Sequence, residues 1–188
     1  MILAAGTGAR LGGVAKALLP IEGTTYLERI AATARTVGLD HGVVVVAAPH
    51  GDAVGAQARR LGLAVCSNVD PTRGMASSIA VGFASLIPFA ELGAAWLWPA
   101  DHPMVRAQTL STLISRLEAY DAVRPVWRGR GGHPPLIARR LWDRMARCGE
   151  VEGGARTVIA SASTCVVEID DPGVVHDVDT PADRERVR

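Results

Sequence analysis

Residues 3–16 read LAAGTGARLGGVAK, and they are the most informative part of the sequence. A run of small apolar residues, typical of a buried strand, leads directly into a loop with glycines at positions 6, 8, 12 and 13. Glycine lets the backbone turn and approach a ligand where a Cβ would clash. Free backbone N–H groups in such a loop form a concave anion site, and Arg10 and Lys16 add full positive charges. The loop therefore predicts a site for a nucleotide di- or triphosphate.

The glycine spacing departs from the two common phosphate-binding motifs. A dinucleotide fingerprint requires G-x-G-x-x-G and an acidic residue about twenty positions later. Here the spacing is G-x-G-x-x-x-G, and the next apolar run, at 43–48, ends without an acid. A P-loop requires G-x-x-x-x-G-K-[ST], whereas Lys16 follows alanine and precedes Ala17. The alternative interpretation is a flexible glycine turn that binds nothing.

Composition limits the class of protein. The chain has 188 residues, so we expect 1–188 to form a single domain with a substantial core. A net charge of +1 argues against general binding to nucleic acid or to a membrane surface. Three cysteines, at 66, 148 and 165, form neither a disulfide framework nor a zinc pattern. No stretch approaches about twenty apolar residues, and no basic stretch precedes an apolar run, so the expected compartment is the cytoplasm.

Apolar runs alternate with helical patterns along the chain. The runs at 43–48 and 94–98 are continuously apolar, as in strands buried on both faces. Residues 26–37 have helical spacing, with Thr24 or Thr25 as N-cap and Gly38 as C-cap. The other expected elements are strands at 2–5, 63–66, 122–126 and 165–169, helices at 52–61, 77–86, 108–120, 139–147, 155–161 and 181–187, and a hairpin around 128–133. This alternation predicts an α/β fold, a three-layer sandwich around a mostly parallel sheet.

Three segments should meet at one edge of this sheet. Ligands of open α/β sheets bind at the carboxyl ends of the strands. The glycine loop follows the first strand, the segment NVDPTRGMASS at 68–78 follows the strand at 63–66, and Asp101 follows the strand that ends at Trp98. We therefore expect these parts of the chain to line one ligand site.

Two aspartates are candidate metal ligands. A carboxylate just past a buried strand is held rigidly, and Mg²⁺ prefers one or two protein carboxylates together with phosphate oxygens. Asp101, in WPADHP, fits this role, and its alternative role is that of a turn residue. Asp179, in HDVDTPAD, is the second candidate, and its alternative role is that of a helix N-cap before Pro181.

Other polar residues have both a functional and a structural interpretation. Ser77 and Ser78 follow Gly74 at an expected helix start, where free N–H groups attract anions. Either serine could instead be a plain N-cap. His133, in GGHPPLI, could contact a substrate, act as a base or occupy a turn, and the role of His102 is equally undecided from the sequence.

The order of the motifs is more specific than any one of them. Along the chain follow LAAGTGARLG…K, NVDPTRGMASSIAVG, PADHPMV, RGRGGHPPLI, GGAR and HDVDTPAD. This series closely resembles the MobA-like nucleotidyltransferase family and, within it, the molybdenum cofactor cytidylyltransferase branch. The resemblance covers almost the whole chain. It implies a Rossmann-like fold of the nucleotide-diphospho-sugar transferase type and transfer of NMP from an NTP to an acceptor phosphate, with release of pyrophosphate and Mg²⁺ as cofactor.

The resemblance also implies roles for individual residues. Arg10, Lys16 and Asp101 would be the catalytic residues, with Asp101 and Asp179 holding the metal. The implied nucleotide-binding residues are Leu3, Ala4, Ala5 and Gly6 at the base and ribose, Gly8, Arg10 and Lys16 at the triphosphate, and Gly74, Ser77 and Ser78 in a second segment, with His133 on the acceptor side.

The resemblance further favours CTP over GTP, because the first motif reads LAAG and the second reads GMASSI. The implied partners are the NTP, molybdopterin as the phosphorylated acceptor, and an acceptor enzyme of the molybdenum hydroxylase type. Two alternatives stay open. The acceptor could be a sugar phosphate or an alcohol phosphate, or the protein could be a nucleotide-binding regulator that has lost turnover.

Overall fold

Four parallel strands form the first sheet, in the order β5-β4-β1-β7. The structure, a computed structural model, describes residues 1–39 and 41–177, without the side chain of Arg10. Strand β1 (Ile2–Leu3) pairs with β4 (Val43–Val46) on one side and with β7 (Trp98–Pro99) on the other, and β5 (Ala64–Ser67) lies beside β4. All four residues of β4 are buried, as its continuous apolar sequence predicts.

A second, mixed sheet continues from the first. Strand β6 (Ala94–Trp96) is separated from β7 by one residue, so a single segment of chain belongs to both sheets. This sheet has the order β11-β8-β10-β6, in which β8 spans Ala122–Trp127, β10 spans Leu136–Ala138 and β11 spans Thr164–Glu168. Strand β10 is antiparallel to both of its neighbours, whereas β11 is parallel to β8.

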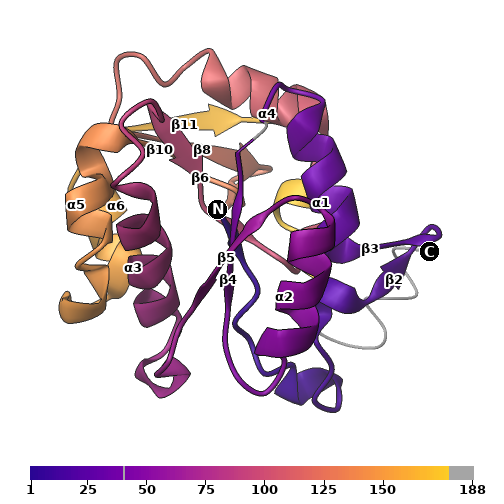
Figure 1. Ribbon diagram of the computed structural model, residues 1–188. Helices are drawn as coiled ribbons and strands as arrows, with labels where there is room; N and C mark the ends of the chain where they lie inside the picture. The colour runs from indigo at the N-terminus through magenta and orange to yellow at the C-terminus, as the bar shows by residue number, and fades with distance from the viewer. Residues whose placement is uncertain (40, 178–188) are drawn as a thin grey trace.

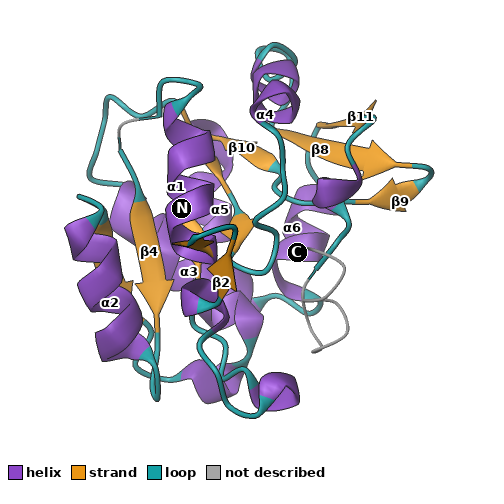
Figure 2. Cartoon of the chain, turned by 90° about the vertical axis from the view of Figure 1, so that its right-hand side faces the viewer, coloured by secondary structure: helices purple, strands orange, loops and turns teal. Residues whose placement is uncertain are grey.

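Helices cover both faces of the sheets, and the chain forms three layers (Figure 1). One core cluster joins strand residues to α1 (Tyr26–Arg35), α2 (Gly51–Arg60) and α4 (Ala107–Ile114). The other joins them to α3 (Met75–Leu86), α5 (Trp142–Met145) and α6 (Gly154–Ala160). Figure 2 shows the same layers after a turn of the view. The predicted fold class, a three-layer α/β sandwich with a mostly parallel sheet, is confirmed.

Local signals account for several of the boundaries. Helix α1 begins with a capping box in which Glu28 N–H donates to the Thr25 hydroxyl at 3.2 Å and Thr25 N–H donates to the Glu28 carboxylate at 2.6 Å. The helix ends at Arg35 with Thr36 as its C-cap, so the predicted C-cap Gly38 is wrong by two residues; Gly38 lies in the turn that follows, with a φ of +78°, which glycine adopts without strain. The expected hairpin is present, since β9 (Arg130–Gly131) pairs with β8 in antiparallel register.

Other boundaries differ from the prediction. Helix α4 ends at Ile114 and not at residue 120, because the chain turns through i→i+3 hydrogen bonds toward β8. The helix predicted at 139–147 is divided into a 3₁₀ turn (Arg139–Leu141) and the short α5. Strand β10 and the small hairpin of β2 (Pro20–Ile21) with β3 (Thr24–Thr25) are not predicted at all.

Because β1, β4, β5 and β7 run parallel, their carboxyl ends meet at one edge of the sheet. Strand β8 has the same direction, since both it and β6 are antiparallel to β10. No helix in the described part of the chain is long and apolar enough to cross a membrane. The predicted closing helix at 181–187 lies outside the described residues.

Candidate active site

A cavity of about 340 Å³ opens at the carboxyl edge of the parallel sheet. Three segments line it, one after each of the strands β1, β5 and β7, so the predicted convergence is confirmed. The lining residues are Leu3, Ala4, Ala5, Gly6, Thr7, Lys16, Ala17, Pro71, Gly74, Met75, Ser78, Pro99, Ala100 and Asp101.

The glycine loop after β1 is folded back on itself around Gly8. Gly8 has a φ of +63°, and a Cβ there would lie 1.9 Å from the carbonyl oxygen of Val14. The carbonyl of Gly8 accepts hydrogen bonds from the N–H groups of Leu11 at 2.8 Å and Gly13 at 3.0 Å. Only glycine fits this position, whereas a Cβ on Gly6 would meet no atom within 4 Å because it faces open space. Arg10 lies in the 3₁₀ turn Ala9–Leu11 of the same loop.

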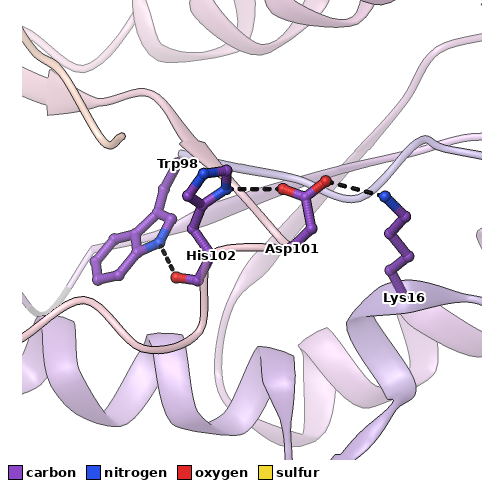
Figure 3. Close-up of polar contacts among 4 residues, drawn as sticks. All are labelled: Lys16, Trp98, Asp101 and His102. Atoms are coloured by element: carbon purple, nitrogen blue, oxygen red, sulfur yellow. Dashed lines mark hydrogen bonds and ion pairs between the residues drawn. The ribbon is translucent and has the colours of Figure 1, made fainter. Parts of the chain in front are cut away.

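An ion pair joins the glycine-loop segment to the segment after β7. Lys16 Nζ lies 3.1 Å from Asp101 Oδ2, and each side chain is 22% exposed. The other carboxylate oxygen, Oδ1, accepts a hydrogen bond from His102 Nδ1 at 2.9 Å, and the carbonyl of His102 accepts one from Trp98 Nε1 at 2.9 Å (Figure 3). The carboxylate is therefore held from both sides at the cavity wall.

The surroundings of Asp101 keep it ionised. Burial alone would raise its pKa, but the hydrogen bond and charge of His102 and the charge of Lys16 together hold the pKa well below its usual range. The result is a fixed negative charge, paired with a cation, at a site lined by a glycine loop.

The residues present fit a metal ion that arrives with a nucleotide. The described residues contain no cluster of three or more histidine, cysteine, aspartate or glutamate side chains, so they form no cage made of protein ligands alone. Mg²⁺ commonly binds through one or two carboxylates and completes its coordination with waters and substrate phosphates. Asp101 meets the carboxylate requirement. Asp179, the second predicted metal ligand, lies outside the described residues.

The start of α3 gives the two serines different roles. Gly74, with a φ of +84°, is the N-cap, so neither Ser77 nor Ser78 caps the helix. Ser78 lines the cavity. Ser77 lies outside the lining, and its hydroxyl donates to the carbonyl of Gly74 at 2.7 Å.

Sequence reasoning passed over Asn68, whose side-chain amide donates to both serine hydroxyls. An asparagine directly after a strand, at the edge where ligands bind, is the signal that could have drawn attention to it. Thr7, Ala17, Pro71, Met75, Pro99 and Ala100 also line the cavity without having been singled out, because their chemistry is unremarkable in the sequence.

His133 does not line the cavity. Its ring is 4.9 Å from the ring of His102, and its backbone N–H donates to the carbonyl of Val174 at 2.7 Å. Burial, followed by the positive charge of His102, lowers the pKa of His133 to about 4, so its ring is neutral at pH 7. Its Nδ1 is buried without a hydrogen-bond partner in the described part of the chain.

The fold and this cavity define an α/β enzyme of the nucleotide-binding class, with its site at the carboxyl edge of the parallel sheet. The model of the MobA-like NTP transferase domain matches residues 1–166, which is most of the chain. The protein belongs to this family, and it is a nucleotidyltransferase.

Comparison with individual proteins gives three informative relatives. A curated relative, the nicotine blue oxidoreductase of Paenarthrobacter nicotinovorans, is 33% identical over 189 residues, which cover 96% of this chain and 91% of the relative. The crystal structure of Rv0371c from Mycobacterium tuberculosis H37Rv has 26% identity and a TM-score of 0.81, over 98% of this chain and 94% of that chain.

A nucleotidyl transferase from Methanothermobacter thermautotroptrophicus shares the fold, with a TM-score of 0.77 at 20% identity, over 100% of this chain and 94% of that chain. Rv0371c has also been solved in complex with manganese.

Proposed function

We propose that this protein transfers CMP from CTP to the phosphate of molybdopterin, releases pyrophosphate and depends on Mg²⁺. The single observation that carries the proposal is the Lys16–Asp101 ion pair at the wall of the cavity that the glycine loop lines. A cation beside an ionised carboxylate at the wall of this cavity supports the binding of a triphosphate together with its metal. The later recipient of the product would be an enzyme of the molybdenum hydroxylase type.

The reaction needs positioning and charge neutralisation rather than a side-chain nucleophile. An oxygen of the acceptor phosphate attacks the α-phosphorus of CTP in line, a new P–O bond forms, and the bond to the β-phosphate breaks. The electron pair of that bond leaves with pyrophosphate. Lys16, together with Arg10 of the same loop, would stabilise the charge that develops on this leaving group.

Asp101 would hold the metal ion, with Asp179 as the proposed second carboxylate. When bound, Mg²⁺ neutralises charge on the phosphate oxygens. Lys16 Nζ lies against one of the two carboxylate oxygens of Asp101. We propose that Lys16 exchanges this carboxylate for a phosphate oxygen when the nucleotide binds, so that Asp101 can accept the metal.

The backbone at 3–6 would receive the base and the ribose. Ala5 places a methyl group where a glycine would leave more room, so the space beside the base suits a pyrimidine better than a purine. Backbone N–H and C=O groups at this position can match the donor and acceptor pattern of cytosine.

Pyrophosphate release tests the proposal directly. The purified protein is incubated with Mg²⁺ and with each of the four NTPs, in the presence and absence of molybdopterin. We expect release with CTP that depends on both the acceptor and the metal. Release that requires a sugar phosphate or an alcohol phosphate instead would keep the enzyme class and replace the acceptor, and tight NTP binding without release would favour a regulator.

The name of the 33% identical relative favours a second candidate function, the reduction of a dye such as nicotine blue. Oxidation of NADH or NADPH in the presence of such a dye measures this activity. The glycine spacing at 6–12 departs from the dinucleotide fingerprint and so favours the transferase.

A further inference from the structure

Asn68 lies directly after β5, next to the cavity, and its side chain has one possible orientation. The residue is 5% exposed. The side-chain oxygen Oδ1 of Asn68 accepts a hydrogen bond from the backbone N–H of Asp70 at 3.1 Å. Because a backbone N–H can only donate, this contact assigns the oxygen and the nitrogen of the amide. The amide nitrogen therefore faces α3.

Both amide hydrogens of Asn68 are used within α3. The Nδ2 group donates to the hydroxyl oxygen of Ser77 at 2.8 Å and to that of Ser78 at 2.9 Å. Each serine thus receives a hydrogen bond at its oxygen, and each keeps one hydrogen to donate.

The two serines differ in where that hydrogen goes. Ser77 donates to the carbonyl of Gly74 at 2.7 Å, inside the protein. For Ser78 no acceptor is found among the described residues, although it is only 5% exposed and lines the nucleotide cavity. Within the network Asp70–Asn68–Ser77–Ser78, the hydrogen of Ser78 and one lone pair of its oxygen have no partner among the described residues, and the Asn68 amide excludes that hydrogen from its own side. A polar hydrogen that is buried, unpaired and at the wall of a cavity is suited to an acceptor on a ligand.

We propose that Asn68 is a positioning residue that fixes the Ser78 hydroxyl as a hydrogen-bond donor to the base of the bound nucleotide. This proposal rests on the proposed function, because it assumes that the cavity holds an NTP. The acceptor that distinguishes cytosine is its ring nitrogen N3, because the C2 carbonyl oxygen is present in uracil as well. Uracil and guanine carry an N–H at the corresponding ring position, and two donors that face each other leave both unpaired. The Ser78 hydroxyl therefore favours cytosine by its polarity, in addition to the steric effect at Ala5.

Asn68→Asp reverses the polarity with almost no change of shape. A carboxylate still accepts from the backbone N–H of Asp70, but it cannot donate to the serines. The hydrogen of Ser78 would then turn toward residue 68, and its lone pairs would face the cavity. The added negative charge weakens binding of every NTP, so the informative quantity is the ratio of the CTP and UTP affinities. We expect this ratio to fall by about fivefold, the effect of one hydrogen bond.

Two further variants show whether the effect passes through Ser78. Ser78→Ala should lower the same ratio, and Asn68→Asp should then change it no further in the Ser78→Ala background. Ser85→Ala is the matched control, because this serine of the same helix donates to the carbonyl of Gly82 and does not line the cavity. It should leave the ratio unchanged.

The experiment is calorimetric binding of CTP, UTP and GTP with Mg²⁺ and without acceptor, together with thermal unfolding to confirm that each variant is folded. A CTP to UTP ratio that is the same in Asn68→Asp and wild type overturns the proposal. A change that persists in full in the Ser78→Ala background overturns it as well. Wild-type turnover is measured separately: if no NTP yields pyrophosphate, the proposed function fails, whereas the binding ratios still decide the role of Asn68.

Discussion

Replacing Asp101 by asparagine should separate catalysis from folding. The substitution keeps the size of the side chain and one oxygen, but it removes the charge and turns an amide N–H toward either Lys16 Nζ or His102 Nδ1. The ion pair is partly exposed, at 22% for each side chain, so its loss costs about 1 kcal/mol. In a chain of this length that corresponds to roughly 2–4 °C in Tm.

The effect on turnover should be much larger than the effect on stability. A metal ion that neutralises transition-state charge contributes several kcal/mol. At about 1.4 kcal/mol for each factor of ten, loss of its carboxylate predicts a fall in kcat/KM of about 100-fold or more. The assay is Mg²⁺-dependent pyrophosphate release, measured beside thermal unfolding of the same samples.

Asp121→Asn provides the matched control for this prediction. Asp121 likewise pairs with a cation, the guanidinium of Arg140, but it precedes β8 and so lies at the opposite edge of the sheet. It should change Tm slightly and leave turnover intact. If Asp101→Asn kept pyrophosphate release within about fivefold of wild type, the metal role of Asp101 would be refuted and the residue would be a structural turn aspartate.

Three further predictions concern the same site. Lys16→Ala should weaken NTP binding or slow transfer by about tenfold or more. Lys16→Arg should restore this only in part, because the planar guanidinium of arginine fills the space differently from a compact ammonium. Equal NTP affinity of wild type and Lys16→Ala in calorimetry would contradict this prediction. Ala5→Gly should lower the preference for CTP over GTP in kcat/KM, and an unchanged ratio would mean that this loop does not select the base. The pKa of His133 is lowered to about 4, so the unfolded chain takes up a proton between pH 6.5 and 4 that the folded protein does not. The free energy of unfolding should therefore fall by up to about 3 kcal/mol as the pH drops from 6.5 toward 4. His133→Asn should make Tm less dependent on pH over this range.

The elements that the sequence predicts well carry their information locally. The four valines of β4 are all buried, so a continuous apolar run is enough to indicate a strand covered on both faces. Thr25 and Glu28 form the capping box that fixes the start of α1 without help from other parts of the chain.

The elements that the sequence misses depend on distant partners. Strand β10 follows two consecutive prolines, 134 and 135, a pattern that favours a turn. It becomes a strand because β6 and β8 lie on either side and pair with it at Leu136 and Ile137. The pairing partners of these two residues are 13 to 42 residues away in sequence, so no local pattern could show them.

The candidate site shows the same difference between what nearby residues determine and what distant packing determines. The rule that ligands bind at the carboxyl edge predicts which segments meet, and the cavity lies there. It does not predict which side chain of a segment faces the cavity. Ser77 and Ser78 are adjacent on α3, about 100° apart around the helix, and only Ser78 reaches the cavity wall. That distinction comes from how α3 packs against the sheet.

The ion pair between Lys16 and Asp101 couples binding of the metal to binding of the nucleotide in the proposed function. A partly buried carboxylate without a cation would be costly, and the ammonium of Lys16 beside it offsets that cost. A nucleotide that brings its own metal replaces each partner with another of the same charge: phosphate for the carboxylate at Lys16, and metal for the ammonium at Asp101. The exchange therefore leaves neither charge unpaired, and it links metal binding to nucleotide binding. On this reasoning Mg²⁺ should bind more weakly without CTP than with it, because it competes with the Lys16 ammonium for the carboxylate and lacks the phosphate oxygens that a nucleotide supplies. Magnesium affinity measured with and without CTP tests this, and tight binding of Mg²⁺ in the absence of nucleotide would contradict the proposed exchange.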